Sequence, residues 1–257
     1  MGYDSSMLNG LNILPQYKDY FHLNTATTGL NNAASWIGSL MGCLIIQPVP
    51  DKLGRKKAIL VSAIICFIGC IIQSAAQNIG MFVVGRIIVG LGAQLSSGAC
   101  PVLIAELLPP ARRGAMLGLF FSCYYIGSLM AAGVNYRTVE IDSTWSWRIS
   151  SILQCVPSIL ALVLLPFVPE SPRWLIDRGQ LEHAREVLTI MDGKPDVNDP
   201  GVQAVFDEVI TVLKVEEEQY PRNPWVEIVS TRATRKRLVI IVVFGIMIEM
   251  LGNFATS

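Results

Sequence analysis

Long uncharged stretches alternate with short charged turns along this chain. Residues 23–50 carry no charged side chain, and neither do residues 58–85. Apolar runs of about 18 residues or more are long enough to cross a bilayer as helices. The pattern predicts complete membrane spans over residues 27–49, 58–76, 81–105, 115–136 and 147–168. The chain is therefore expected to be an all-α membrane protein.

Both ends of the sequence resemble parts of helices. Residues 1–14 are too short and too polar to span a bilayer alone, and we expect them to be the last part of a first helix. Residues 238–257 begin another apolar run, which we expect to be the start of a seventh helix. The five complete spans would then be the second to the sixth.

Lys and Arg residues are concentrated in alternate loops. The loops after the first, third and fifth complete spans hold the basic residues Lys52, Arg55, Lys56, Lys57, Arg112, Arg113, Arg173, Arg178 and Arg185. Loops 77–80 and 137–146 hold few. Because basic loops are retained on the cytoplasmic side, this distribution predicts that the loops after residues 49, 105 and 168 are cytoplasmic.

Residues 170–237 differ from the rest of the chain, because their charges are dense and of both signs. Apolar residues recur at amphipathic spacing in 181–191 and 202–215, which predicts two short helices. Turn-forming residues fill 192–200 between them. We expect three parts: a transmembrane half over 1–169, a cytoplasmic helical linker over 170–237, and the start of the seventh helix over 238–257.

The composition agrees with a membrane protein and excludes several function classes. Of the 257 residues, 52% are hydrophobic and 16% are charged, whereas soluble domains carry about 25% charge. A net charge of +0 gives no indication of a nucleic-acid partner. The six cysteines lie in apolar segments with no histidine or acid beside them, which argues against a disulfide or a metal site. No nucleophile–base pair or phosphate-binding loop is present, so neither an enzyme nor a cofactor is expected.

Three motifs occur in a fixed order. Residues 51–56 read Asp-x-x-Gly-Arg-Lys, and residues 169–174 read Pro-Glu-Ser-Pro-Arg-Trp. Between them stand Gly85-Arg86, the run 101–109 that contains Glu106, and Arg113-Gly114. This order resembles the sugar porter family of the major facilitator superfamily. Gly-Tyr-Asp at 2–4, Tyr-Ile-Gly-Ser at 125–128, and Trp-Arg-Ile at 147–149 with Gln154 are similar to its fungal, lactose-permease-like branch.

The resemblance implies a fold and an activity. The fold would be that of the major facilitators, represented by part of the first helix, helices two to six, the cytoplasmic linker and part of helix seven. The activity would be transport of a sugar by alternating access, coupled to protons, in a multi-pass protein of the plasma membrane. The implied partners are a sugar or polyol, protons and the lipid bilayer. The oligomeric state stays open.

Complete carriers of this kind have about twelve spans in two halves, with the substrate between them. This chain is therefore expected to be an incomplete carrier. Three alternatives remain open at this point. The solute could be another polyhydroxy compound such as a polyol or a quinate-like acid, the protein could be a sugar sensor that moves nothing, or it could be a remnant without transport activity.

Arg86 is the sharpest single signal in the sequence. It lies about five residues inside the predicted span 81–105, or ~8 Å along the helix. A charge at that depth is costly unless it is paired, and it is by default a functional candidate. We expect Asp4 in the first helix to be its partner. The resemblance implies the same pair, with Asp4 as the proton acceptor whose protonation releases Arg86; a purely structural ion pair is the alternative.

Charged residues at the cytoplasmic helix ends form a second candidate site. Gly54 allows a tight turn across which Asp51 and Arg55 can pair. The resemblance implies a cytoplasmic gate, an ion-pair cluster that opens when the carrier faces inward, formed by Asp51, Gly54, Arg55, Lys56, Glu106, Arg113, Glu170 and Arg173. Ordinary snorkelling of charged side chains at helix ends is the alternative, and we prefer it for Lys57, Arg112 and Lys236.

The residues that bind substrate are less clear from the sequence. The resemblance points to the fifth span and the seventh helix. Cys123 and Ser128 stand where members of the family carry glutamine, and Glu249 stands where a seventh-helix glutamine is expected, shortly before Asn253. These four residues are the substrate-binding candidates, and they indicate no particular sugar.

Overall fold

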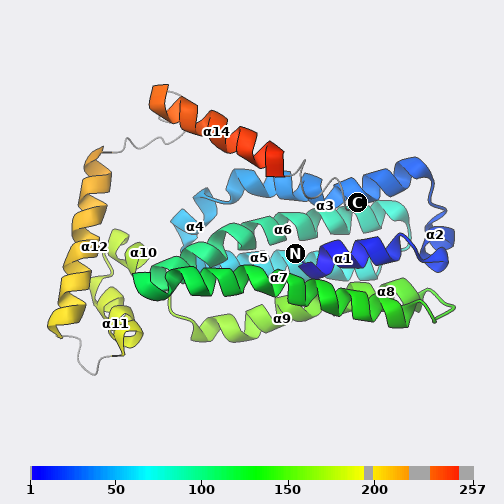
Figure 1. The fold of residues 1–257 in the computed structure, drawn as a ribbon. Coiled ribbons are helices and arrows are strands. Elements are labelled where there is room, and N and C mark those ends of the chain that lie inside the picture. Colours follow the sequence, from blue (N-terminus) through cyan, green and yellow to red (C-terminus); the bar gives the residue numbers. More distant parts are fainter. Residues whose placement is uncertain (1, 194–198, 220–231, 249–257) are drawn as a thin grey trace. The chain divides into compact units, whose positions relative to one another are not determined.

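The computed structural model describes residues 2–193, 199–219 and 232–248 (Figure 1). Every regular element in these ranges is a helix, as the apolar runs predict. Glu249 and Asn253 lie outside the described residues. The chain forms two compact units, residues 1–202 and 203–257.

The first unit contains the membrane helices. Its elements are α1 (Gly2–Leu11), α2 (Pro15–Phe21), α3 (Thr25–Ile45), α4 (Pro48–Leu53), α5 (Arg55–Ser74), α6 (Ile79–Leu107), α7 (Pro110–Thr138), α8 (Trp145–Leu153), α9 (Cys155–Leu164), η1 (Leu165–Phe167), α10 (Pro172–Asp177) and α11 (Leu181–Asp192). Four helical segments are long and apolar enough to cross a membrane, namely Arg55–Ser74, Ile79–Leu107, Ala111–Thr138 and Trp145–Phe167. They confirm four of the five predicted spans.

The remaining predicted span, residues 27–49, corresponds to α3. This helix has 21 residues, enough to cross a bilayer, but its polar first half keeps it below the hydropathy of the other four. A capping box between Asn24 and Thr27 fixes its start. Its end was predicted four residues too late. Pro48 and Pro50 cannot donate the backbone hydrogen bonds that would continue α3, and Pro48 instead opens the short helix α4.

The predicted span 147–168 is one hydrophobic stretch but not one uninterrupted helix. It breaks at Gln154, between α8 and α9, and it ends in the 3₁₀ turn η1. Pro157 explains the break, because it has no N–H to donate to the carbonyl oxygen of Leu153. The interruption places a polar side chain, Gln154, at a bend inside an apolar segment.

Helix α6 lies along both α3 and α5, and α1 packs against α7 (Figure 1). Glycine permits the closest of these approaches. A Cβ at Gly38 of α3 would overlap the carbonyl oxygen of Ile87, and a Cβ at Gly90 of α6 would overlap that of Ser35. Small residues let helix backbones approach closely in lipid. Side chains of α3 can therefore contact Arg86 on α6 directly.

Aromatic side chains join α2 to the starts of α6 and α8. Tyr17, Phe21, Phe82 and Trp147 are buried, with ring centroids 5.1–6.2 Å apart where Trp147 meets the other three. Arg148 lies over the Trp147 ring at 5.0 Å. Aromatic pairs of this kind contribute about 0.5–1.5 kcal/mol each beyond area burial. The cluster stabilises the start of α6, one helical turn before Arg86.

The second unit contains α14 (Arg232–Ile248) and most of α12 (Pro200–Gln219). The linker helices predicted at 181–191 and 202–215 are present as α11 and α12. The seventh helix was expected to begin at residue 238, whereas α14 begins at Arg232. Arg and Lys are good helix formers, so the basic stretch before the apolar run joins the helix instead of preceding it. The division into 1–169, 170–237 and 238–257 stays a prediction.

Candidate functional site

Asp4 and Arg86 meet inside the first unit, as the sequence predicts. Arg86 Nη2 lies 3.5 Å from Asp4 Oδ2, and the two side chains are 1% and 15% exposed. Gln154 Nε2 donates a hydrogen bond of 2.8 Å to the other carboxylate oxygen, Oδ1. The break between α8 and α9 therefore places an amide directly on the candidate proton acceptor.

The pair belongs to a longer series of polar contacts. Arg86 Nη2 also donates to Ser35 Oγ at 3.2 Å, and Gln73 Nε2 donates to Gln154 Oε1 at 3.3 Å. We call the series Ser35–Arg86–Asp4–Gln154–Gln73 the polar chain. It joins α3, α6, α1, the α8–α9 break and α5. All five side chains are buried or half-buried in an otherwise apolar bundle. A polar group without a hydrogen-bond partner would be costly there.

Three members of the polar chain were not predicted as site residues. Ser35, Gln73 and Gln154 are uncharged, so nothing in their sequence context demands a partner. Gln154 did offer a signal, because it stands three residues before Pro157 in a long apolar run. A polar residue at a proline-broken point of a membrane helix commonly lines an internal site.

A cavity of about 450 Å³ opens beside Asp4. It lies among α1, α5, α6, α7 and α9, and apolar side chains with scattered serine hydroxyls form most of its wall. Asp4, Gln154 and Cys123 all line it. A solute or water that enters this cavity reaches the Asp4 carboxylate, whereas Arg86 lies behind that carboxylate in the bundle.

The candidate substrate residues separate in the structure. Cys123 is exposed and lines the cavity. The Ser128 hydroxyl instead donates to the carbonyl oxygen of Gly2 at 3.1 Å, which joins α7 to α1 and gives Ser128 a packing contact. Glu249 and Asn253 fall outside the described residues, so their predicted role is not tested.

Arg55 is the centre of the candidate gate. Its Nε lies 3.1 Å from Glu106 Oε2, and its Nη1 lies 3.6 Å from Asp51 Oδ1. Arg55 and Glu106 are each 14% exposed, whereas Asp51 is 54% exposed. The Arg55 cluster, formed by these three residues, connects α4, α5 and α6. Two of the three charges in this cluster therefore lie in a partly buried contact.

Glu170 makes a different kind of contact. Its Oε1 accepts hydrogen bonds of 3.0 Å from the backbone N–H groups of Lys56 and Ser171. A carboxylate at the start of α5 is favoured by the unpaired N–H groups and the dipole of that helix. Gly54 makes room for it, because its φ is 97° and a Cβ there would overlap Glu170 Oε2.

The gate residues do not all come together. Arg113 was expected in the ion-pair cluster, but among the described residues it forms no ion pair; its Nε donates to the Leu108 carbonyl oxygen at 3.4 Å. Pro109 ends α6, and Arg113 then falls on the exposed side of α7. Arg173 lies in the first turn of α10, and Lys56 Nζ donates to the Pro166 carbonyl oxygen at 2.8 Å.

Two residues near the gate were missed by the sequence interpretation. Trp174 Nε1 and Arg178 Nη2 donate to the carbonyl oxygen of Asp51 at 3.0 and 3.1 Å. Arg178 also lies over the Trp174 ring at 5.5 Å. Both contacts bring the start of the linker onto the turn at residues 51–54. A tryptophan in the Pro-Glu-Ser-Pro-Arg-Trp motif was the available signal.

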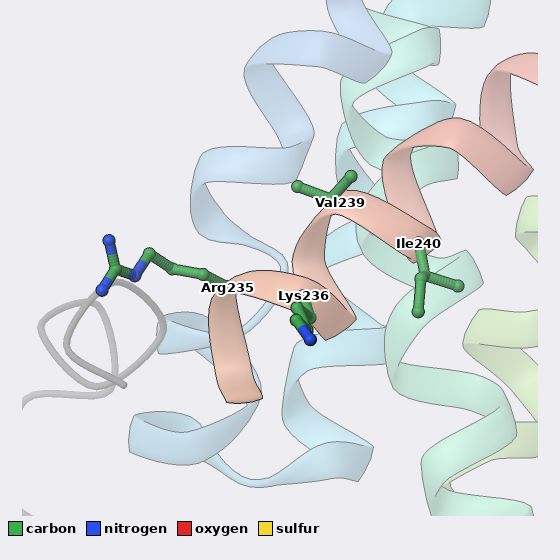
Figure 2. A pocket seen from close by; sticks show the side chains of 4 residues that line it. All are labelled: Arg235, Lys236, Val239 and Ile240. Carbon is green, nitrogen blue, oxygen red and sulfur yellow. The ribbon is translucent and has the colours of Figure 1, made fainter. Parts of the chain in front are cut away.

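A second hollow, of about 370 Å³, lies on α14 in the other compact unit (Figure 2). Arg235 and Lys236 stand one turn before Val239 and Ile240, and these four side chains line it. Cations followed by aliphatic side chains are typical of a helix that enters a membrane from its cytoplasmic face.

Among the described residues, no group of three His, Cys, Asp or Glu side chains could hold a metal ion.

The whole chain, residues 1–257, matches the family model described as Sugar (and other) transporter. It is 33% identical over 229 residues to the glucose transporter GlcP of Staphylococcus epidermidis, which covers 87% of this chain and 48% of that protein. It is 34% identical over 209 residues to a high-affinity glucose transporter of Kluyveromyces lactis, covering 81% of this chain and 38% of that protein.

Solved structures agree with these relatives. The proton:xylose symporter XylE bound to 6-bromo-6-deoxy-D-glucose superposes with a TM-score of 0.76 and 26% identity, covering 85% of this chain and 51% of that chain. A partially occluded, inward-open conformation of XylE from E. coli gives a TM-score of 0.75. The chain thus spans about half the length of the transporters it matches.

Proposed function

Because the chain belongs to the sugar (and other) transporter family of the major facilitator superfamily, we propose that it moves a sugar across a membrane together with a proton. The observation that carries this proposal is the contact of Asp4 with Arg86 and Gln154 at the edge of a cavity. Since the relatives are about twice as long, we assign the activity to a carrier in which a second half faces this one.

The chemistry of the polar chain supports proton coupling. Asp4 lines the cavity, so water there can deliver a proton to its carboxylate. The ionised carboxylate attracts the buried guanidinium of Arg86, and the protonated carboxyl group does not. Proton binding therefore weakens the link between α1 and α6. The proton acts here as a ligand. When a ligand binds one facing state more tightly than the other, its binding changes the relative free energies of the two states.

We assign the gate to the Arg55 cluster and the Glu170 contact. The Arg55 cluster holds α4, α5 and α6 together, and Glu170 holds the end of the sixth span at the start of α5. We expect both to hold the carrier closed at its basic face and to separate when it opens there. Arg113 and Arg173 are assigned to contacts with the second half. Lys56 contributes through its backbone N–H.

Two finer assignments belong to the same proposal. The motifs at 2–4, 125–128 and 147–154 support an assignment to the fungal, lactose-permease-like branch, and we propose that the carrier acts in the plasma membrane. The relatives named above are glucose and xylose transporters by description, which supports a sugar substrate over a polyol, a quinate-like acid or a sensor. Cys123 is the described residue that we assign to the substrate path.

Uptake measurements test the proposal. The chain is expressed in transporter-deficient yeast, alone and together with the C-terminal half of the Kluyveromyces lactis relative, and insertion is verified by protease protection. We expect saturable uptake of radiolabelled glucose or xylose that a proton uncoupler abolishes. Asp4→Asn should abolish accumulation and preserve exchange, and the exposed control Asp19→Asn should preserve both. Inserted protein without saturable uptake in either arrangement would overturn the proposal.

A further inference from the structure

The guanidinium of Arg86 is buried but only partly hydrogen-bonded. Its Nη2 makes both of the contacts described above, to Asp4 and to Ser35. Nε and Nη1 have no hydrogen-bond partner among the described residues, although the side chain is 1% exposed. These two nitrogens carry three N–H donors. Buried polar groups in folded proteins are almost always hydrogen-bonded, so these donors require an explanation.

Two buried amide oxygens stand on the helices that flank Arg86. Asn31 Oδ1 on α3 and Gln73 Oε1 on α5 have no partner within the described residues, and both side chains are 0% exposed. Their amide nitrogens are already engaged. Asn31 Nδ2 donates to the Tyr17 hydroxyl at 2.6 Å, and Gln73 Nε2 donates to Gln154. These bonds fix the orientation of each amide group and leave its oxygen atom available as an acceptor.

Both oxygens belong to the surroundings of Arg86. Asn31 precedes Ser35, which Arg86 already contacts, by one helical turn, so the two residues share a face of α3. Burial raises the pKa of the Tyr17 hydroxyl bonded to Asn31, and the positive charge of nearby Arg86 offsets part of that rise. On the other side, a Cβ built at Gly85 would lie 2.9 Å from the backbone nitrogen of Gln73. Gly85 immediately precedes Arg86.

We propose that Asn31 and Gln73 are positioning residues that receive the Arg86 guanidinium when Asp4 is protonated. The inference rests on the proposed function. A proton from water in the cavity binds the Asp4 carboxylate, and no other bond forms or breaks. Arg86 stays charged and buried, so it needs new acceptors. Asn31 Oδ1 and Gln73 Oε1, the alternate acceptors, hold it inside the bundle while α1 is released.

The titratable neighbours do not compete for this role. Asp4 on α1 is the carboxylate already in the polar chain, and Tyr17 on α2 is kept neutral by burial. The remaining titratable groups around the pair are the phenol of Tyr3 on α1, which donates to the Ser150 carbonyl oxygen, and the thiols of Cys66 and Cys70 on α5 and Cys155 on α9. Neutral amide oxygens therefore provide the available acceptors for a charge that has lost its carboxylate.

A double-mutant cycle on the purified full chain tests the proposal without any need for transport. Asn31→Leu is compared in the natural background and in Asp4→Asn, which imitates the protonated carboxyl, by reversible unfolding in mixed detergent micelles. Because a hydrogen bond to a charged group is worth more than a neutral one, we expect Asn31→Leu to shift the unfolding equilibrium roughly tenfold more in Asp4→Asn. Equal shifts in the two backgrounds would overturn the proposal.

Asn32→Leu is the matched control. Asn32 is the next residue on the same helix, is exposed, and accepts a bond from Asn12 at 2.9 Å. Its effect should be the same in both backgrounds. Gln73→Met, which keeps the length of the side chain and removes the oxygen, should repeat the background dependence of Asn31→Leu. A background dependence for Asn32→Leu as large as that for Asn31→Leu would count against a specific acceptor.

A charge-rescue variant covers the case in which Asn31→Leu does not fold. Asn31→Asp supplies a carboxylate at the proposed acceptor position. In Asp4→Asn it should restore an ion pair with Arg86 and stabilise the chain at least tenfold in the unfolding equilibrium, whereas with Asp4 present it should stabilise less. Absence of rescue would contradict the proposal, because Arg86 could then not reach position 31.

Uptake separates this inference from the proposed function. In the yeast assay, we expect Asn31→Leu to lower proton-driven accumulation at least fivefold and to preserve exchange. If Asn31→Leu has different effects in the two backgrounds but no arrangement supports uptake, the transport proposal is overturned and the alternate acceptors are not. Proton-driven uptake without background dependence in the cycle would defeat the alternate acceptors alone.

Discussion

The polar chain and the Arg55 cluster each place an arginine beside acids, but they surround it differently. Arg86 is 1% exposed and shares Asp4 with an amide, whereas Arg55 is 14% exposed and is held by Glu106, by Asp51 and by the carbonyl oxygen of Pro50. Inside the bundle, water is excluded, so only other protein groups can replace a lost partner. At the membrane surface water can take over. We therefore expect the same residue type to act as a switch in the polar chain and as a structural contact in the Arg55 cluster.

The largest effect should come from the arginine at the centre of the polar chain. Arg86→Met leaves Asp4 without its cation, and removal of one partner from a buried pair costs about 3–5 kcal/mol. We expect a loss of that order in the free energy of unfolding, together with loss of proton-driven uptake. Reversible unfolding in detergent measures the first. Arg86→Met paired with Asp4→Leu should recover much of the loss; no recovery would mean that Arg86 has other essential partners.

Arg55 tests the other side of this comparison, because water can reach its partners once the arginine has been replaced. Arg55→Met removes one charged hydrogen bond and an ion pair to Glu106, and it should destabilise the chain by about 1–3 kcal/mol. The effect should be smaller than that of Arg86→Met when both are measured by the same unfolding assay. If Arg55→Met proved the more damaging, burial would not be what distinguishes the two sites.

Gln154→Leu tests whether the amide on Asp4 is part of the switch. It removes the 2.8 Å bond to Asp4 Oδ1 and the partner of Gln73. We expect a loss of about 1.5–3 kcal/mol. The proton dependence of uptake should also change, because the ionised carboxylate loses a donor that favours it. An unchanged pH profile would make Gln154 a purely structural residue.

Gly54→Ala tests the Glu170 contact. A side chain at a φ of 97° is strained, and its Cβ would displace Glu170 Oε2 from the start of α5. We expect about 1–2 kcal/mol of destabilisation. Gly114→Ala is the matched control, because open space surrounds that glycine. Hydrogen exchange at the first amides of α5 would show whether the loss is local, and equal effects of the two substitutions would exclude Glu170 as the cause.

The smallest effect belongs to an ion pair outside both regions. Arg137 Nη1 lies 3.7 Å from Glu140 Oε2, with side chains that are 77% and 66% exposed. Arg137→Gln should change stability by less than about 0.5 kcal/mol, because exposed pairs contribute little. This variant sets the baseline for the other substitutions. An effect as large as that of Arg55→Met would show that exposure is a poor guide in this protein.

Prediction from the sequence succeeded where a physical requirement could be met in only one way. A guanidinium inside an apolar span needs an acid, and Asp4 was the acid available in the neighbouring helix. Apolar runs of membrane length likewise identified the spans. The proline residues at 48, 50 and 157 limited helix ends within those runs, and their effect was underestimated.

The neutral members of the site could not be predicted in the same way. Ser35, Asn31 and Gln73 can satisfy their hydrogen bonds in many settings, so their sequence context requires no particular partner. The contact of Ser35 with Arg86, and the positions of Asn31 and Gln73 on the flanking helices, depend on how closely α3 and α5 approach α6. That approach is a property of the folded bundle. The surroundings of Arg113 could not be predicted for a related reason. Its spacing suits an ion pair, but the turn at Pro109 places it on the exposed side of α7.

Cys123 has a practical consequence for experiments on this protein. Of the cysteines in the described helices, Cys123 and Cys43 are exposed and the other four are buried or half-buried, and Cys123 faces the cavity beside Asp4. A membrane-impermeant, negatively charged thiol reagent can reach such a sulfur atom only through water. With Cys43→Ser as the background, the rate at which Cys123 is labelled would report the hydration of the cavity in real time.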